Sequence, residues 1–283
     1  MAIELVDIPT STSPLAALFY AAGDAGARAS ALLMHGNGMN FYTGALRFLP
    51  PRLVDRGVAC LAYNRHGHDT VSCPTRDPEG NAYQTTEEAV TDNDCAAAFL
   101  EARGHDRPVV IGHSNGGMLA AHHVARHPET PALVLLSAHC GGAEMVRRAS
   151  ELGRFAGEGF DEFVSRATQL VDTGRGNELM TMPGWYYVTT AVSFVDTLTN
   201  SPVLLEDAAN ISCPVLFIRG SDEDRDLYPA EAFARAAPGR VDVRIIDDCD
   251  HFYTGHEDAV GAIVAEWLDT VIAQPMTTNS EAV

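Results

Sequence analysis

A serine flanked by glycines is the most reactive pattern in the sequence. In the stretch VVIGHSNGG, Gly112 and Gly116 each lie two positions from Ser114, and Gly117 follows directly. Small neighbours are needed at these positions when a serine lies on a very tight strand-to-helix turn, because the two backbones nearly touch there. Such a turn raises the hydroxyl above the sheet and places the next N–H groups at a helix N-terminus, which stabilises negative charge. The alternative is an ordinary glycine-rich loop whose serine caps a helix.

The later part of the chain supplies the two other groups that a serine nucleophile needs. Three acids, Asp222, Glu223 and Asp224, come shortly after Gly220, and His251 lies in the stretch DDCDHFYTG. A histidine can take the proton of the serine hydroxyl, and an acid can fix the tautomer of that histidine. The chain order serine, acid, histidine is the one that a nucleophile on a strand-to-helix turn requires.

A glycine-flanked loop near the N-terminus can stabilise an oxyanion. The stretch MHGNGMN contains His35, Gly36, Asn37 and Gly38 directly after an apolar run. We expect the backbone N–H groups of Asn37 and Asn115 to be the two donors. Loss of one such donor typically removes about 2.7–4 kcal/mol of transition-state stabilisation.

The elements that position these groups alternate between strands and helices. The short apolar runs, rich in Val, Ile and Leu, predict buried strands; they cover residues 30–36, 57–64, 107–113, 131–138, 213–220 and 241–247, after an opening hairpin of 3–9 and 15–22. Helical patterns lie between or after them, at 41–55, 85–103, 115–127, 229–237 and 256–273. This alternation predicts an α/β fold with a doubly wound, mostly parallel sheet, whose ligands bind at the carboxyl ends of the strands.

One interval, from Cys140 to about Asn210, breaks this rhythm and contains no strand candidate. Its segments 143–155, 160–174 and 185–198 have helical patterns, which predicts a helical cap over residues 140–210. The core domain then comprises residues 1–139 and 211–274, and residues 275–283 form a flexible tail. The aromatic residues of the cap either line a pocket or bury the cap against the core; they are Trp185, Tyr186, Tyr187 and Phe194.

Taken together, these features resemble the α/β-hydrolase superfamily over nearly the whole chain. The likeness rests on the His35–Gly36 loop, the turn of residues 112–116, the acidic loop after Gly220 and the late His251 before a terminal helix. It implies a mixed eight-stranded sheet with a cap after the sixth strand. It also implies that the triad acid stands three residues after the loop glycine. That acid is Glu223, with Asp224 as the next choice.

Composition limits the partners. The 283 residues are 46% hydrophobic and 20% charged, as expected for one large globular domain with an insertion. The net charge of −19 would be repelled by nucleic acids and anionic membranes, and an anionic substrate would need a local positive patch. Six scattered cysteines without a CxxC pair indicate free thiols. The acidic N-terminal stretch is unlike a secretory signal, and no apolar run reaches a membrane span, so we expect a cytoplasmic protein.

Several other side chains are candidates for substrate contact. His113 stands beside the serine and Cys140 follows the next strand, and a role in the core is as open for each as substrate contact. Trp185 and Tyr186 belong to the cap. His66 and His68 have the spacing of a metal pair, but no third ligand is suitably spaced. We therefore expect no metal and no cofactor.

A serine nucleophile forms an acyl-enzyme, so the substrate should contain a cleavable acyl group. Our first hypothesis is a serine hydrolase acting on a carboxylic ester or lactone of a small to medium apolar substrate. The same fold could instead host a C–C bond hydrolase or a cofactor-free lyase. A third possibility is a non-catalytic receptor for a small ligand. We expect a small-molecule substrate as the partner, and the sequence leaves a homodimer open.

Overall fold

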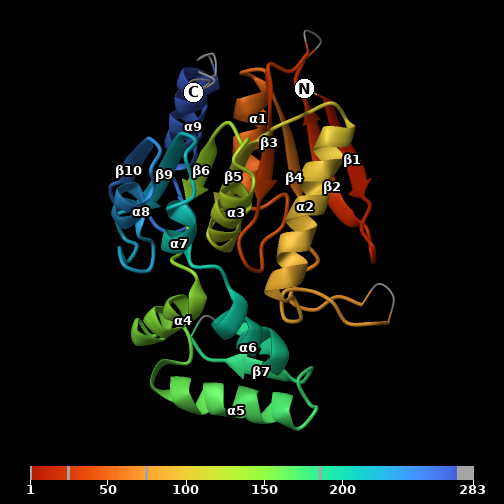
Figure 1. The fold of residues 1–283 in the computed structure, drawn as a ribbon, viewed down its shortest axis with the longest axis vertical. Helices are drawn as coiled ribbons and strands as arrows, with labels where there is room; N and C mark the ends of the chain where they lie inside the picture. The colour runs from red at the N-terminus through yellow and green to blue at the C-terminus, as the bar shows by residue number, and fades with distance from the viewer. Residues whose placement is uncertain (1, 24–25, 74–75, 185–186, 273–283) are drawn as a thin grey trace, which may run out of the picture.

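The computed structural model describes residues 2–23, 26–73, 76–184 and 187–272. The chain forms a large α/β core and a smaller cap, which lies at one end of the core in Figure 1. The expected tail, residues 275–283, lies outside the described residues. None of the described helices is long and apolar enough to cross a membrane.

The core is built on an eight-stranded sheet with the order β1-β2-β4-β3-β5-β6-β9-β10. The first pair is an antiparallel hairpin, β2 is antiparallel to β4, and the remaining neighbours are parallel. The mostly parallel eight-stranded sheet is therefore confirmed. The strands are β1 (Ala2–Ile8), β2 (Leu15–Ala21), β3 (Ala29–Met34), β4 (Val58–Tyr63), β5 (Val109–His113), β6 (Leu133–Leu136), β9 (Val215–Gly220) and β10 (Val241–Ile246).

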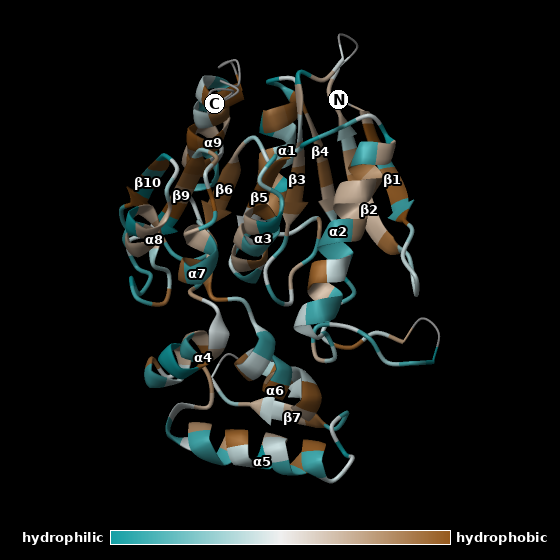
Figure 2. Ribbon diagram, viewed as in Figure 1, coloured by the Kyte–Doolittle hydropathy of each residue, from teal (hydrophilic) through white to brown (hydrophobic). Residues whose placement is uncertain are grey.

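Helices cover both faces of this sheet, and Figure 2 shows their mixed colouring beside the mostly hydrophobic central strands. One face packs against α1 (Ala45–Val54) and α9 (Glu257–Ile272). The other face packs against α2 (Thr86–Ala102), α3 (Asn115–Arg126), α7 (Leu204–Ala208) and α8 (Ala230–Ala236). Strands buried on both faces must be apolar along their length, and every residue of β4 and β5 is buried.

Helix boundaries follow local signals. Helix α2 begins after Thr85, whose side chain accepts from the N–H of Glu88 while the Glu88 carboxylate accepts from the N–H of Thr85. Helix α1 begins at Ala45 rather than at Phe41, as the sequence had suggested. The reason is Gly44, which has φ 54° and therefore cannot continue a right-handed helix.

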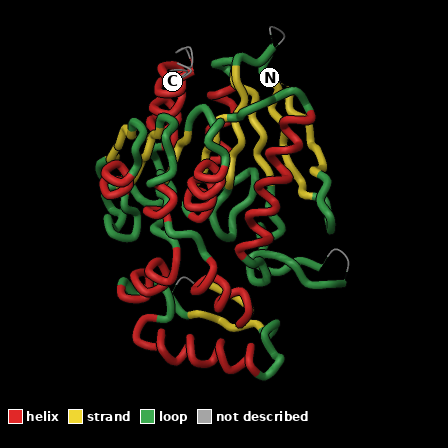
Figure 3. Tube along the Cα trace, in the orientation of Figure 1, coloured by secondary structure: helices red, strands yellow, loops and turns green. Residues whose placement is uncertain are grey.

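The cap lies between β6 and α7 in the chain. It contains α4 (Gly142–Glu151), the 3₁₀ turn η1 (Gly157–Gly159), α5 (Phe160–Asp172) and α6 (Ala191–Asn200). It also contains an antiparallel pair, β7 (Leu179–Met182) and β8 (Tyr187–Thr190), part of which is drawn in yellow among the cap helices in Figure 3.

The expectation of a cap without strands was therefore wrong. Residues 187–190 form β8 instead of starting a helix, and α6 begins only after Thr190, whose hydroxyl oxygen accepts from the N–H of Ser193. The sequence of β8, Tyr-Val-Thr-Thr, is aromatic and β-branched, and such residues favour a pleated strand. The preceding Pro183 and Gly184 are typical of a turn.

Candidate active site

Ser114 lies on the sharp turn between β5 and α3. Its backbone has φ 57° and ψ −121°, a conformation that is strained for a residue with a side chain. A Cβ atom on Gly112 would lie 2.2 Å from the carbonyl oxygen of Gly116, and one on Gly116 would lie 2.3 Å from that of His35. Only glycine fits at either position. The close packing expected for the turn is thus present, and the serine side chain lines a cavity.

The structure brings three of the expected residues into one hydrogen-bonded chain. His251 Nε2 lies 3.0 Å from Ser114 Oγ, and His251 Nδ1 lies 2.7 Å from Glu223 Oε1. These residues come from three separate strand ends, after β5, β9 and β10. In the neutral tautomer with the proton on Nδ1, the imidazole donates to the carboxylate and accepts from the serine hydroxyl.

The carboxylate of Glu223 is fixed by two further donors. Its Oε2 accepts from the N–H of Gly220 at 2.8 Å and from the hydroxyl of Ser137 at 2.6 Å. The residue is 6% exposed, so these bonds offset the cost of burying a charge. Ser137 in turn lies 2.8 Å from the hydroxyl of Tyr253. The sequence offered no signal for these two supporting residues, because each depends on the packing of neighbouring strand ends.

Neither flanking acid is hydrogen-bonded to His251. Asp222 is exposed. Asp224 accepts from Nε and Nη2 of Arg148, at 3.1 and 2.7 Å, and these bonds hold the pKa of its carboxyl down at about 2. Because Arg148 belongs to α4, this pair ties the acidic loop of the core to the cap. Of the three candidate acids, Glu223 is the one beside His251.

The loop after β3 faces the serine turn. Asn37 lines the same cavity as Ser114, and a Cβ atom on Gly36 would lie 3.1 Å from that of Ser114. The N–H of Gly38 donates to Asn81 Oδ1 at 3.1 Å. Within the described residues, the N–H groups of Asn37 and Asn115 have no acceptor in the protein. They are the two groups for which we expect an oxyanion role.

A buried arginine connects these two loops. Arg65 is 1% exposed, and its Nη2 donates to the carbonyl oxygen of His35 at 2.9 Å and to Asn115 Oδ1 at 3.2 Å. The N–H of Arg65 also donates to His35 Nε2 at 3.0 Å, which leaves Nδ1 of His35 as the donor to the carbonyl of Gly36. Burial and the nearby guanidinium hold the pKa of His35 well below its usual range. The neutral imidazole and the guanidinium together fix the loop that presents Asn37.

Two of the expected substrate contacts do not line the cavity. His113 is 1% exposed, and its Nε2 donates to the carbonyl oxygen of His251 at 2.9 Å; it therefore supports the backbone of that histidine. Burial lowers the pKa of His113 to about 3. Cys140 packs in the apolar cluster of the cap, where burial raises the pKa of its thiol to about 12. Trp185 and Tyr186 lie outside the described residues.

The cavity has a volume of about 660 Å³, and residues of both the core and the cap line it. The cap contributes apolar walls, among them Met145, Phe155 and Tyr187. Phe194, which could have lined the pocket, instead packs edge-on against Phe163 with ring centroids 4.9 Å apart. A cavity of this size fits a small or medium substrate.

His66 and His68, whose spacing is that of a metal pair, are both engaged in hydrogen bonds. Both ring nitrogens of His66 are hydrogen-bonded, one to Asp92 and one to the carbonyl oxygen of Ser13. His68 Nδ1 lies 3.1 Å from the carbonyl oxygen of Arg65. The spacing of these two histidines therefore does not translate into a pair with free ligand atoms.

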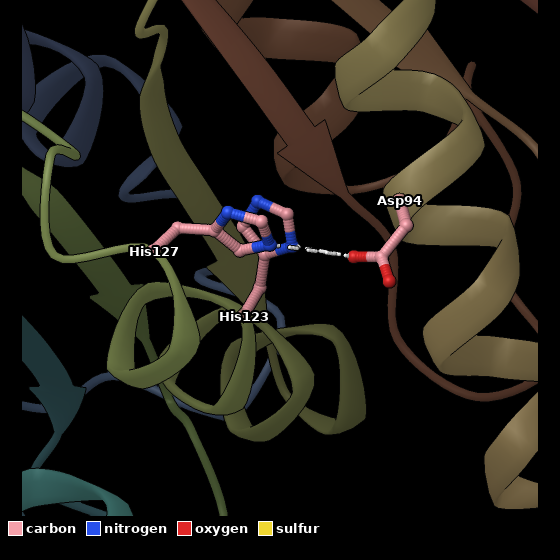
Figure 4. Close-up of side chains that lie close together, drawn as sticks. All are labelled: Asp94, His123 and His127. Carbon is pink, nitrogen blue, oxygen red and sulfur yellow. Dashed lines mark hydrogen bonds and ion pairs between the residues drawn. The ribbon is translucent and has the colours of Figure 1, made fainter.

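A second group, far from the cavity, consists of Asp94, His123 and His127, whose ligand atoms lie within 4.8 Å of one another (Figure 4). The two imidazoles stack with centroids 4.2 Å apart and 27° between their planes. His123 Nδ1 and His127 Nε2 lie 3.1 and 3.7 Å from the same oxygen, Asp94 Oδ1. Asp94 already accepts from His123 at 3.1 Å and pairs with Arg126 at 3.4 Å. We interpret this cluster as an ion-pair network between α2 and α3.

Solved structures with the same fold include several esterases. Est1E from Butyrivibrio proteoclasticus with ferulic acid bound is 19% identical and superimposes with a TM-score of 0.73 over 95% of this chain and 100% of that one. The esterase domain of a Rhodothermus marinus protein is 20% identical, with a TM-score of 0.68 over 96% and 100%. A carboxyl esterase from Bacillus coagulans is 14% identical, with a TM-score of 0.71 over 96% and 100%. At these identities the likeness shows the fold alone.

A family model identifies the family of this chain. No curated protein matches the chain. Residues 31–266, however, match the Alpha/beta hydrolase family, and this range includes the serine turn, the acidic loop and His251. With the strand order, the strand-end residues and this match all pointing the same way, the chain belongs to the alpha/beta hydrolase family.

Proposed function

We propose that this protein is a serine hydrolase that cleaves a carboxylic ester or lactone of a small to medium apolar substrate. The observation that carries the proposal is the hydrogen-bonded chain from Ser114 through His251 to Glu223, which opens on a cavity of about 660 Å³. The esterases among the structures of the same fold support the choice of an ester as the scissile group.

The proposed reaction has two halves. Ser114 Oγ attacks the ester carbonyl while its proton passes to His251 Nε2, and the oxyanion that forms accepts from the N–H groups of Asn37 and Asn115. His251 then gives the proton to the leaving alcohol oxygen, which leaves the acyl group on Ser114. A water molecule, deprotonated by His251, attacks the carbonyl of the acyl-enzyme. The bond to Ser114 then breaks, His251 returns the proton to Ser114 Oγ, and the acid is released. Glu223 stabilises the imidazolium that forms in each half.

Hydrolysis of p-nitrophenyl butyrate by wild type and by Ser114→Ala tests the proposal. We expect wild type to turn over this ester, and the variant to lose roughly 10⁴–10⁶ in kcat, because only binding and the oxyanion donors remain. Ser165→Ala is the matched control, since Ser165 is exposed on α5 in the cap. A Ser114→Ala protein that keeps a tenth of the wild-type rate would refute the serine mechanism.

A further inference from the structure

His139 is a buried histidine in the wall of the active-site cavity that the proposed reaction does not use. It follows β6 by three residues, at the same edge of the sheet as Ser114, and it is 5% exposed. The residue lines the cavity that Ser114 and His251 also line.

The hydrogen bonds of His139 define its tautomer. The backbone N–H of Gly141 donates to His139 Nδ1 at 3.2 Å. A backbone N–H can only donate, so Nδ1 must carry the lone pair and the proton of the neutral ring must be on Nε2. Burial, together with the charge of nearby His251, lowers the pKa of His139 to about 3. At neutral pH the residue is therefore an uncharged donor with a fixed direction.

That donor has no partner in the protein. Seven buried side-chain nitrogen and oxygen atoms of the described residues lack a hydrogen-bond partner, and Nε2 of His139 is the one whose residue lines this cavity. Most buried polar atoms in folded proteins are hydrogen-bonded, and an unpaired one costs stability. An unpaired donor in the wall of a substrate cavity is accounted for if the substrate supplies the acceptor.

We propose that His139 Nε2–H donates a hydrogen bond to an uncharged oxygen of the substrate other than the ester group that reacts. The substrate class would be esters or lactones with an additional ether, hydroxyl or carbonyl oxygen, in either the acyl or the alcohol part. This inference rests on the proposed function.

Charge favours an uncharged acceptor over a carboxylate. The cavity wall contains the acids Asp222, Glu223 and Asp250, against one arginine, Arg154, and two histidines, His139 and His251. A carboxylate close to three acids would be repelled in this partly enclosed site. Nε2 is buried in the structure, so the proposed bond requires the side chains around the ring to move when a substrate binds.

Binding to the Ser114→Ala protein tests the proposal without depending on turnover. Isothermal titration calorimetry would compare butyl pentanoate with two isosteres, butyl 3-methoxypropanoate and 2-methoxyethyl pentanoate. In each isostere an ether oxygen replaces one methylene group, either in the acyl chain or in the alcohol chain. We expect one of the two ethers to bind roughly tenfold more tightly than butyl pentanoate, and the tighter one identifies the part of the substrate that faces His139.

Two substitutions at position 139 distinguish the role of the Nε2–H donor from that of the bond between Nδ1 and the N–H of Gly141. In His139→Asn the side-chain oxygen can still accept from the N–H of Gly141, but the donor at the Nε2 position is lost. In His139→Gln the amide nitrogen retains a donor near that position. We expect the preference for the ether to disappear with Asn and to persist with Gln. His122→Asn is the matched control, because His122 lies on α3 beside Asp207, outside the cavity lining.

The outcomes are distinct from those of the esterase test. Equal binding of all three esters to the Ser114→Ala protein would overturn the role of His139, even if wild type hydrolyses butyl pentanoate rapidly. A preference that survives in His139→Asn would overturn it as well. If no ester is hydrolysed by wild type but the ether preference is present and is lost in His139→Asn, the proposed reaction fails while the binding role of His139 stands.

Discussion

The core and the cap of this protein position their functional residues in different ways. In the core, Ser114, Glu223 and His251 each follow a strand, and the hydrogen-bonded sheet places these strand ends side by side. In the cap, cavity-lining residues such as Met145 come from helices and a short strand pair that pack through apolar side chains. In the proposed function, the sheet therefore sets the chemistry of the site, and the cap sets the shape available to the substrate.

The largest effect on activity is expected from a substitution of Glu223, the acid of the core that bonds to His251. Glu223→Gln should lower kcat for p-nitrophenyl butyrate by roughly 10²–10⁴, because the imidazole loses the acceptor that fixes its tautomer. The loss in kcat should be similar for every ester, because the substitution affects the reaction step and not how the substrate fits the cavity. Asp222→Asn, at the exposed neighbour, should change kcat less than tenfold. Equal losses in the two variants would contradict the assignment of Glu223.

A cap substitution should instead change the ranking of substrates. Met145 is 6% exposed and lines the cavity, so Met145→Ala enlarges the space for the acyl chain. We expect kcat/KM for p-nitrophenyl octanoate relative to butyrate to rise by about threefold to tenfold, in line with one or two added methylene contacts.

Val146→Ala is the matched control for this experiment. Val146 is buried in the same apolar cluster but does not line the cavity. It should lower stability, as truncation of a buried side chain does, and leave the chain-length ratio unchanged. The separation of core and cap roles would be wrong if both variants shifted the ratio alike.

The smallest effect, a change in stability, is expected from the ion pair between Asp224 of the core and Arg148 of the cap. Asp224→Asn removes a charge-assisted pair with Arg148 of the cap and should cost about 1 kcal/mol of stability, the upper end for a partly exposed pair. The pKa of Asp224 is lowered to about 2 in the folded protein. The pair therefore stabilises fully above the ordinary carboxyl pKa of about 4, and this contribution is lost as the pH falls towards 2.

Thermal unfolding at several pH values would measure how the stabilisation by the Asp224–Arg148 pair depends on pH. The difference in Tm between wild type and Asp224→Asn should be constant above pH 5 and should shrink below pH 4. Asp226→Asn, whose side chain is 75% exposed and 3.9 Å from Arg148, should show almost no difference. A gap in Tm that widens on acidification would contradict the role given to this pair.

The contrast between core and cap also explains which parts of the structure could be predicted from the sequence. The strands of the core are short apolar runs separated by turn residues, and all eight appear where the pattern placed them, to within a few residues. The turn at Ser114 could be recognised because Gly112 and Gly116 are required by backbone contacts. Spacing alone did not decide between the three acids after Gly220; the hydrogen bond to His251 did.

The cap was harder to predict because its elements are short and depend on tertiary packing. The four residues of β8 are stabilised by pairing with β7, and four residues carry too little periodicity to distinguish a strand from the first turn of a helix. Helix α1 was expected to start earlier because the positive φ of Gly44 cannot be read from its identity. His113 was a candidate for substrate contact because it neighbours Ser114, but it ends β5 with its side chain buried and bonded to the carbonyl oxygen of His251.

The central claim is that His251 and Glu223 make Ser114 a nucleophile. Its most direct test is covalent labelling with a fluorophosphonate, followed by mass spectrometry of the labelled peptides. We predict a single adduct on Ser114 in wild type, no labelling of Ser114→Ala, and labelling of Glu223→Gln that is slower by roughly 10² or more. Absence of an adduct in wild type, or an adduct on another residue, would contradict the account.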